Sequence, residues 1–206
     1  MRKSVVICVS LGLVIACAIP ALAANIQGTN GPNTIFGTVN KDVINGLGGN
    51  DIIRGLGGND RINGGSGNDR VDGDGTCPAT SRPYYCVGNG TGGADNIAGA
   101  SGADTLRGNA RNDRITGGAN GDRIDGGTGN DNIDGGSGND NITGASGNDK
   151  IRGGSSVDRI SGGSGRDVIN ARDGRRDSVK CGSGRDRVTA DRRDRVARDC
   201  ERVTRR

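Results

Sequence analysis

Residues 126–143 read GGTGNDNID-GGSGNDNIT, two nine-residue units joined without a break. Each unit has six residues rich in Gly and Asn that end in Asp, followed by three residues with an aliphatic in the middle. Gly and Asn tolerate the backbone angles of tight turns. A polar–aliphatic–polar triplet fits a very short strand with one buried face. The stretch therefore predicts an alternation of turns and short strands.

The same nine-residue period extends through most of the chain. Asp, or Asn at position 33, recurs every nine residues from Asn33 to Asp69 and from Asp95 to Asp167, then less regularly to Asp194. One unit cannot bury its own aliphatic, whereas stacked units can, so the array predicts a solenoid. We expect the core to consist of the aliphatics two residues after each Asp or Asn, which are Ile35, Ile44, Ile53, Ile62, Val71, Ile97, Leu106, Ile115, Ile124, Ile133, Ile142, Ile151, Ile160, Ile169, Val179, Val188 and Val196.

The clean units at 64–72, 126–134 and 135–143 resemble the hemolysin-type (RTX) nonapeptide, G-G-x-G-x-D-x-U-x. The resemblance extends from about residue 33 to residue 196. It implies an all-β parallel β-roll (a β-solenoid) with two repeats per coil, and several Ca²⁺ ions held between stacked turns by Asp carboxylates and backbone carbonyls. The metal ligands that it implies are Asp51, Asp60, Asp69, Asp104, Asp122, Asp131, Asp140, Asp149, Asp158 and Asp167.

The acidic residues also favour calcium. Asp supplies 23 of the 24 acidic residues, and Ca²⁺ takes six to eight oxygen ligands. Without a metal, Asp residues two units apart, such as Asp122 and Asp140, would stack on one edge of the solenoid and repel each other. The alternative is an Asx-turn role without metal. That alternative is stronger for Asn33, which carries no charge, and for Asp113, whose turn lacks most of the glycines.

The first 23 residues have the features of a secretory signal peptide. Arg2 and Lys3 precede an apolar run, and 21–23 read Ala-Leu-Ala, a small-residue cleavage site. The run is short for a membrane span. Residues 14–17 are similar to a lipobox, which would lipidate Cys17, but the apolar residues that follow favour simple cleavage. We therefore expect a secreted, extracellular protein with a roll over residues 24–196. The 24 Arg against four Lys are typical of a GC-rich bacterial genome.

Four cysteines remain after the signal peptide, and an even number in an exported chain predicts disulfides. Three pairings are possible, of which the most local is Cys77–Cys86 with Cys181–Cys200. Residues one 18-residue coil apart lie about 4.8 Å apart. Cys181 and Cys200 are one residue further apart than that, so with a one-residue slip they come within the reach of a disulfide.

Two segments depart from the repeat. Asp69 and Asp95 are 26 residues apart, where three units would take 27, so residues 73–92 are an insertion that the first disulfide would close. This insertion contains Tyr84 and Tyr85. From Arg172 onward there are 13 basic and seven acidic residues, and Asp alternates with Arg. We expect a salt-bridged C-terminal cap, with residues 197–206 either helical or extended.

The function that these features favour is a secreted calcium-binding repeat protein without enzymatic activity. The chain has no His, which excludes His-based triads and mixed Cys/His zinc sites. Two alternatives stay open: an adhesion protein that contacts a cell surface or matrix through the 73–92 loop, and an accessory module or hydrolase acting on anionic polysaccharide. We expect no nucleic-acid partner and no membrane span after signal cleavage.

Overall fold

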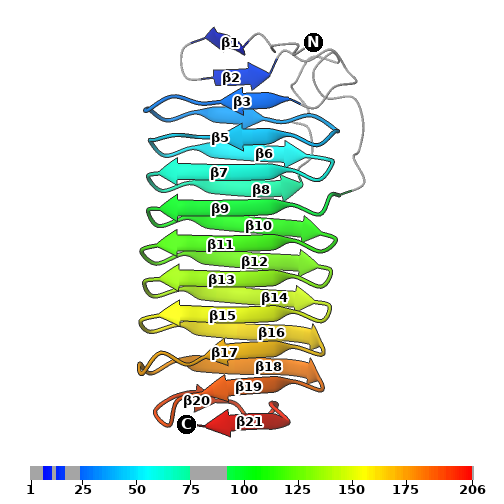
Figure 1. Ribbon diagram of the computed structural model, residues 1–206, viewed down its shortest axis with the longest axis vertical. Helices are drawn as coiled ribbons and strands as arrows, with labels where there is room; N and C mark the ends of the chain where they lie inside the picture. The colour runs from blue at the N-terminus through cyan, green and yellow to red at the C-terminus, as the bar shows by residue number, and fades with distance from the viewer. Residues whose placement is uncertain (1–6, 11–12, 17–23, 75–91, 206) are drawn as a thin grey trace.

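The computed structural model describes residues 7–10, 13–16, 24–74 and 92–205. The chain winds into a rod in which two parallel sheets face each other, and its colour runs steadily from one end to the other (Figure 1). This is the parallel β-roll that the repeat predicts. Among the described residues every regular element is a strand.

The strands alternate between the two sheets along the chain. In neighbour order, sheet A contains β1 (Ile7–Ser10), β2 (Leu13–Ala16), β4 (Thr34–Phe36), β6 (Ile52–Leu56), β8 (Arg70–Asp74), β10 (Thr105–Ala110), β12 (Arg123–Thr128), β14 (Asn141–Ser146), β16 (Arg159–Gly165), β18 (Ser178–Gly184) and β20 (Arg195–Val196). Sheet B contains β3 (Asn25–Gln27), β5 (Val43–Asn45), β7 (Arg61–Ser66), β9 (Asn96–Ser101), β11 (Arg114–Ala119), β13 (Asn132–Ser137), β15 (Lys150–Ser155), β17 (Val168–Ala171), β19 (Arg187–Ala190) and β21 (Arg202–Arg205).

The strand register confirms two units per coil. Ile115 pairs with Ile133, and Ile133 pairs with Ile151, so equivalent residues 18 apart lie side by side in one sheet. Across the insertion Ile62 pairs with Ile97, so the array resumes in register and no repeat is lost. Strand β8 continues through Asp74, so the insertion begins after that residue. The Cys77–Cys86 pairing and both tyrosines lie outside the described residues.

The core is one row of aliphatic side chains from each sheet. All of the expected aliphatics are at most 3% exposed except Val196, which is partly buried where the rod ends. Ile26 joins the same cluster, although its unit has Ala24 where the others have Asp or Asn. Because each aliphatic is covered only by the coils on either side, burial depends on stacking.

Three glycines of one unit show why the turn needs them. A Cβ on Gly126 would lie 2.5 Å from Asp131 Oδ2 and 2.8 Å from the Gly144 carbonyl oxygen, so no side chain fits there. Gly127 and Gly129 have φ angles of 100° and 139°, in the region that L-residues with a side chain rarely adopt. In this unit the first glycine therefore serves the lack of space, and the next two serve the backbone conformation.

The C-terminal residues extend the roll. Strand β21 pairs with β19 in sheet B, so the segment after Val196 is extended and not helical. The predicted disulfide between Cys181 and Cys200 is confirmed, with Cα atoms 5.1 Å apart. Cys181 is fully buried and occupies the inward place that Gly162 has in β16, because the irregular last coils need no glycine there.

The prediction of a salt-bridged C-terminal cap, made from the alternation of Arg and Asp, is wrong. All the ion pairs of the described residues lie upstream of Arg172. The turns of the last coils present backbone N–H groups that need acceptors, and the neighbouring carboxylates accept them. The acidic residues engaged in this way are Asp173, Asp177, Asp186, Asp191, Asp194, Asp199 and Glu201.

Near the other end of the rod, β1 and β2 form an antiparallel pair, and β2 lies parallel to β4. These strands fall within residues 1–23, for which a signal peptide stays a prediction. The part of the chain that the structure describes has no helix with the length and apolar character needed to cross a bilayer.

Candidate metal centre

The repeat aspartates form two ladders, one along each edge of the roll. The backbone N–H of Asp122 donates to Oδ1 of Asp140 at 2.8 Å, and the N–H of Asp140 donates to Oδ1 of Asp158 at 2.9 Å. The expected stacking of Asp122 and Asp140 is therefore confirmed. On this edge the ladder joins Asn33, Asp51, Asp69, Asp104, Asp122, Asp140, Asp158, Asp177 and Asp194.

The second edge has the same arrangement. Its ladder begins with the N–H of Ala24 and ends with Oε2 of Glu201, the only Glu of the chain. The residues between them are Asp42, Asp60, Asp95, Asp113, Asp131, Asp149, Asp167 and Asp186. Sequence analysis missed Glu201 because it follows Asp186 by 15 residues, outside the nine-residue period.

We call each residue of a ladder a rung. In most rungs the second carboxylate oxygen, Oδ2, has no hydrogen-bond partner. Oδ2 is buried and accepts no hydrogen bond in Asp51, Asp60, Asp69, Asp95, Asp104, Asp113, Asp122, Asp131, Asp140, Asp149, Asp158, Asp167, Asp177 and Asp186. Leaving a buried charged oxygen unpaired is costly, so each of these groups needs either a proton or a cation.

Three rungs at the ends of the ladders differ. The side chains of Asn33 and Asp42 accept the N–H of Thr29 and Thr38, and Asp194 Oδ2 accepts the N–H of Asp191. The Asx-turn alternative therefore describes these rungs. Elsewhere the residue four positions before the Asp usually has a positive φ, as at Gly118 and Gly127, and donates no hydrogen bond to that Asp.

The unpartnered oxygens lie beside backbone carbonyls. The space next to Gly126, where any other residue would have its Cβ, faces both Asp131 Oδ2 and the carbonyl oxygen of Gly144 from the next coil. The same arrangement recurs at Gly144, which faces Asp149 and Gly162. Carboxylate and carbonyl oxygens are the hard donors that Ca²⁺ selects, so the residues present fit that ion.

Burial changes the acidity of the ladder. Desolvation raises the pKa of Asp122 to about 7; the N–H of Asp104 opposes this, and the carboxylates of Asp104 and Asp140 raise it further. Burial also raises the pKa of Asp113 to about 8 and that of Asp140 to about 6. Near neutral pH Asp113 therefore largely holds its proton and Asp122 holds one about half of the time, unless a cation takes the place of the proton.

All ten aspartates named from the sequence lie in the ladders with an unpartnered Oδ2. The structure adds Asp95, Asp113, Asp177 and Asp186 in the same setting. Asp113, for which we expected a turn role, accepts no hydrogen bond at Oδ2 although its turn has Arg111 and Asn109 in place of glycine. The sequence contains a signal that identifies all four as ladder residues, since each is followed two residues later by one of the core aliphatics.

A further ladder of asparagines was missed. Oδ1 of Asn130 accepts the N–H of Asn148 at 2.7 Å, and Oδ1 of Asn148 accepts the N–H of Arg166 at 2.8 Å. These bonds run in the opposite direction to the Asp ladder, since here the later residue donates. They explain the Asn that precedes Asp in the clean units.

Two other acidic groups belong to different environments. Asp134, on the outward side of β13, lies 3.5 Å from Arg152, so it faces solvent and not the ladder. Asp199 lies near Cys181 and Cys200, but the two sulfurs are joined in the disulfide, so they offer no thiolate to a metal.

Comparison with known families supports the calcium interpretation. A family model described as the RTX calcium-binding nonapeptide repeat (4 copies) matches residues 24–53, 45–75, 89–124, 107–142, 116–151, 134–169 and 152–175. These matches cover more than half of the chain and most of both ladders. No individual curated protein matches the sequence significantly. Calcium is therefore the ion that these repeats bind, as the sequence predicted.

Proposed function

The chain belongs to the RTX calcium-binding nonapeptide repeat family, and from this premise we propose that calcium, held along both Asp ladders, folds and stabilises the roll. The observation that carries the proposal is the set of buried Oδ2 atoms without a partner. In the unfolded chain the same carboxylates are hydrated and dispersed. An ion that binds only the folded state contributes its binding free energy to folding.

The proposed ligands are the aspartates whose Oδ2 has no partner, together with carbonyl oxygens of the neighbouring turns. For Asp131 the nearest candidate carbonyl is that of Gly144, one coil further along. The bound ion would supply the positive charge that lets Asp122, Asp140 and their neighbours ionise while buried. Asn33 is excluded because its uncharged amide has one oxygen, which accepts the N–H of Thr29, and Asp42 and Asp194 are excluded because Oδ2 of each accepts a backbone N–H within its own turn.

We propose that the protein is secreted, with residues 1–23 as its signal peptide, and that it has no enzymatic activity. A weak affinity for calcium, about 10⁻⁴–10⁻³ M, suits extracellular modules. Such an affinity would leave the roll only marginally stable where calcium is scarce and stabilise it outside the cell.

The test is circular dichroism of the purified protein in chelator and during calcium titration. We expect calcium to increase the β-sheet signal and to raise the melting temperature, and Mg²⁺, which demands a smaller octahedral site, to be far less effective. A full β signal in excess chelator, with a melting temperature that calcium does not change, would refute the proposal. Equilibrium dialysis in parallel counts the bound ions.

A further inference from the structure

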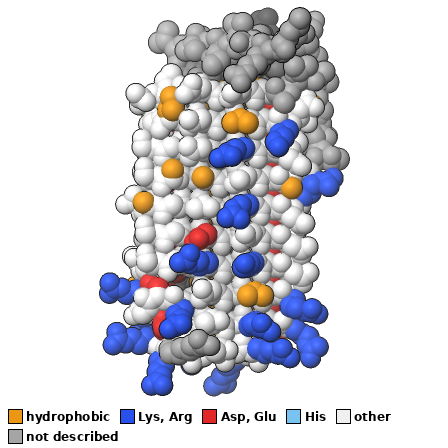
Figure 2. Space-filling model, in the orientation of Figure 1, with side chains coloured by type: hydrophobic (Ala, Val, Ile, Leu, Met, Phe, Trp, Pro, Cys, Tyr) orange, Lys and Arg blue, Asp and Glu red, His pale blue; other side chains and the backbone are white. Residues whose placement is uncertain are grey.

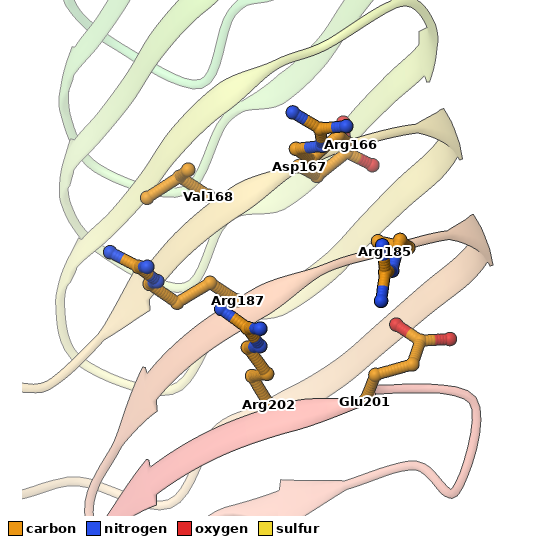
Figure 3. Close-up of a pocket in the computed structure, with 7 residues that line it drawn as sticks. All are labelled: Arg166, Asp167, Val168, Arg185, Arg187, Glu201 and Arg202. Carbon is orange, nitrogen blue, oxygen red and sulfur yellow. The ribbon is translucent and has the colours of Figure 1, made fainter.

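The outer face of sheet B is hollowed toward its C-terminal end. One hollow of about 350 Å³ is lined by Arg114, Lys150 and Arg152. A second of about 590 Å³ is lined by Arg166, Arg185, Arg187 and Arg202 (Figure 3). Val168 lines both, so the two hollows adjoin, and together we call them the sheet B groove.

The cations of the sheet B groove lie in two rows. The first row consists of the opening residues of alternate strands, Arg114 in β11, Lys150 in β15 and Arg187 in β19, and ends with Arg202 in β21. Arg114, Lys150 and Arg187 are on every second strand of the sheet and so lie about 10 Å apart, whereas Arg202 pairs with Arg187 on the neighbouring strand, about 5 Å away. The second row, Arg166 and Arg185, lies one residue before the ladder residues Asp167 and Asp186, where clean units have Asn.

Most of these cations have no ion-pair partner among the described residues. The groove contains one ion pair there, Arg152 with Asp134. Glu201 lies below Arg185 in Figure 3, and its carboxylate accepts the N–H of Asp186 at 2.8 Å. The acidic residues of the last coils likewise accept backbone N–H groups and form no ion pair with the arginines of the groove.

Sheet A offers a contrast. There Asp72 lies within 3.6–3.8 Å of Arg54, Arg70 and Arg107, so one carboxylate serves three arginines.

Figure 2 shows Lys and Arg side chains gathered toward the C-terminal end of the face that it views. Seven Lys and Arg residues line the two hollows of the sheet B groove against Asp134, Asp167 and Glu201, and such an excess of positive charge attracts anions.

We propose that the sheet B groove binds a linear acidic polysaccharide, with the carboxylates of its uronic-acid sugars held by the arginines. The planar guanidinium group binds a carboxylate through two parallel hydrogen bonds, which suits recognition of a repeated acidic group. A groove that follows the rod across successive coils fits an extended chain. The inference goes beyond calcium binding and requires only that the roll is folded.

The side chains of the sheet B groove favour a polysaccharide over a single-stranded nucleic acid. Single-stranded nucleic acids are usually held by stacking on aromatic side chains. Phe36, the aromatic residue in the part of the chain that the structure describes, lies on β4 in the other sheet.

The experiment measures binding of a galacturonic-acid oligosaccharide, too short to gel, to the calcium-loaded protein by calorimetry. The same oligosaccharide with methyl-esterified carboxylates is the neutral control. The test variant is Arg187→Gln/Arg202→Gln in the groove. The matched variant is Arg123→Gln/Arg159→Gln, which removes two exposed arginines from the first positions of β12 and β16 on sheet A and so has the same net charge.

We expect the native protein to bind the acidic form and not the ester. The groove variant should bind about tenfold more weakly or worse, and the sheet A variant within about twofold of native. Circular dichroism in calcium confirms that each variant is folded; if the first groove variant is not, Arg166→Gln/Arg185→Gln takes its place. Absence of binding by the native protein, equal losses in both variants, or tighter binding of a single-stranded DNA of equal charge would overturn the proposal.

Discussion

The backbone N–H of Asp122 donates to Oδ1 of Asp140, one coil further along, at 2.8 Å. The carbonyl oxygen of Asp122 accepts the N–H of Asn141 at the same distance, so both backbone groups of Asp122 are hydrogen-bonded to the next coil. Oδ1 of each rung therefore has a structural role that needs no charge, whereas Oδ2 is left for a cation. The two oxygens of one carboxylate can be tested separately.

Asp140→Asn keeps the acceptor at Oδ1 and removes the charge. In calcium-free protein we expect this change to raise the free energy of unfolding near pH 8 by about 1–3 kcal/mol, because residue 140 no longer has to be ionised while it is buried. In calcium the sign reverses: fewer ions bind, and the calcium concentration at the folding midpoint rises.

The matched control for this variant is Asp134→Asn, which removes a charge from the outward side of β13. It should leave the number of bound ions unchanged. Equal losses of calcium from the two variants would show that the ladder oxygens are not the ligands. Equilibrium dialysis and urea unfolding supply both measurements.

The pH dependence of the calcium-free protein should be unusual. Burial raises the pKa of Asp113 to about 8, of Asp122 to about 7 and of Asp140 to about 6, all above the value of about 3.9 in an unfolded chain. The folded state therefore binds more protons, and stability is greatest below about pH 4 and falls as the pH rises through 6 to 8.

With calcium the expected order is opposite, because protons compete with the ion for the same oxygens. Thermal melting from pH 4.5 to 8.5, with the protein stripped of calcium and then saturated with it, checks both halves. A calcium-free protein that is more stable at pH 8 than at pH 5 would contradict the assignment of buried, unpaired carboxyls.

In the regular coils the first glycine of a unit should be hard to replace for lack of space. Gly126→Ala would place a methyl 2.5 Å from Asp131 Oδ2 and 2.8 Å from the Gly144 carbonyl oxygen. We expect a loss of about 1–3 kcal/mol in stability, together with weaker calcium binding. Gly31→Ala is the control, since nothing lies within 4 Å of its added Cβ. Similar melting temperatures for the two variants would mean that the turn relaxes easily.

The period of the sequence was sufficient to predict a solenoid and its core, because each aliphatic occupies the same place in its unit. The β-roll with two units per coil, and so the register, was predicted from the resemblance to the RTX repeat. Ile26 was missed because its unit has Ala24 in place of Asp. The N–H of Ala24 nevertheless donates to Asp42, as the N–H of a ladder Asp does. The ladder direction could not be predicted, because the nine-residue period places Asp122 and Asp140 one above the other without saying which atom of each meets the other.

The C-terminal arginines were the main error. Alternating Arg and Asp indicates ion pairs only when both side chains are free to meet. In the last coils Asp191 accepts the N–H groups of Asp173 and Gly174, and Asp199 accepts that of Gly182. The sequence carries no information on which turns need acceptors, since that follows from the path of the backbone between irregular units.

Reduction of the Cys181–Cys200 disulfide should loosen only the end of the rod. The bond joins β18 to the segment before β21, and closing a loop of 19 residues contributes about 3 kcal/mol. Hydrogen exchange in calcium should therefore accelerate over residues 187–205 and change little at β11–β14. Cys181→Ser/Cys200→Ser should reproduce the effect. Acceleration across the whole rod would show that the last coils support all the others.

Two units per coil limit how a gene for such a rod can lengthen or shorten. Adding or removing 18 residues inserts or deletes one coil and returns every later strand to its own sheet, as the pairing of Ile133 with Ile151 shows. A change of nine residues would move each later strand to the opposite sheet and carry Arg187 and Arg202 away from the face that bears Arg114 and Lys150. Duplications that preserve this face should therefore come in multiples of 18 codons.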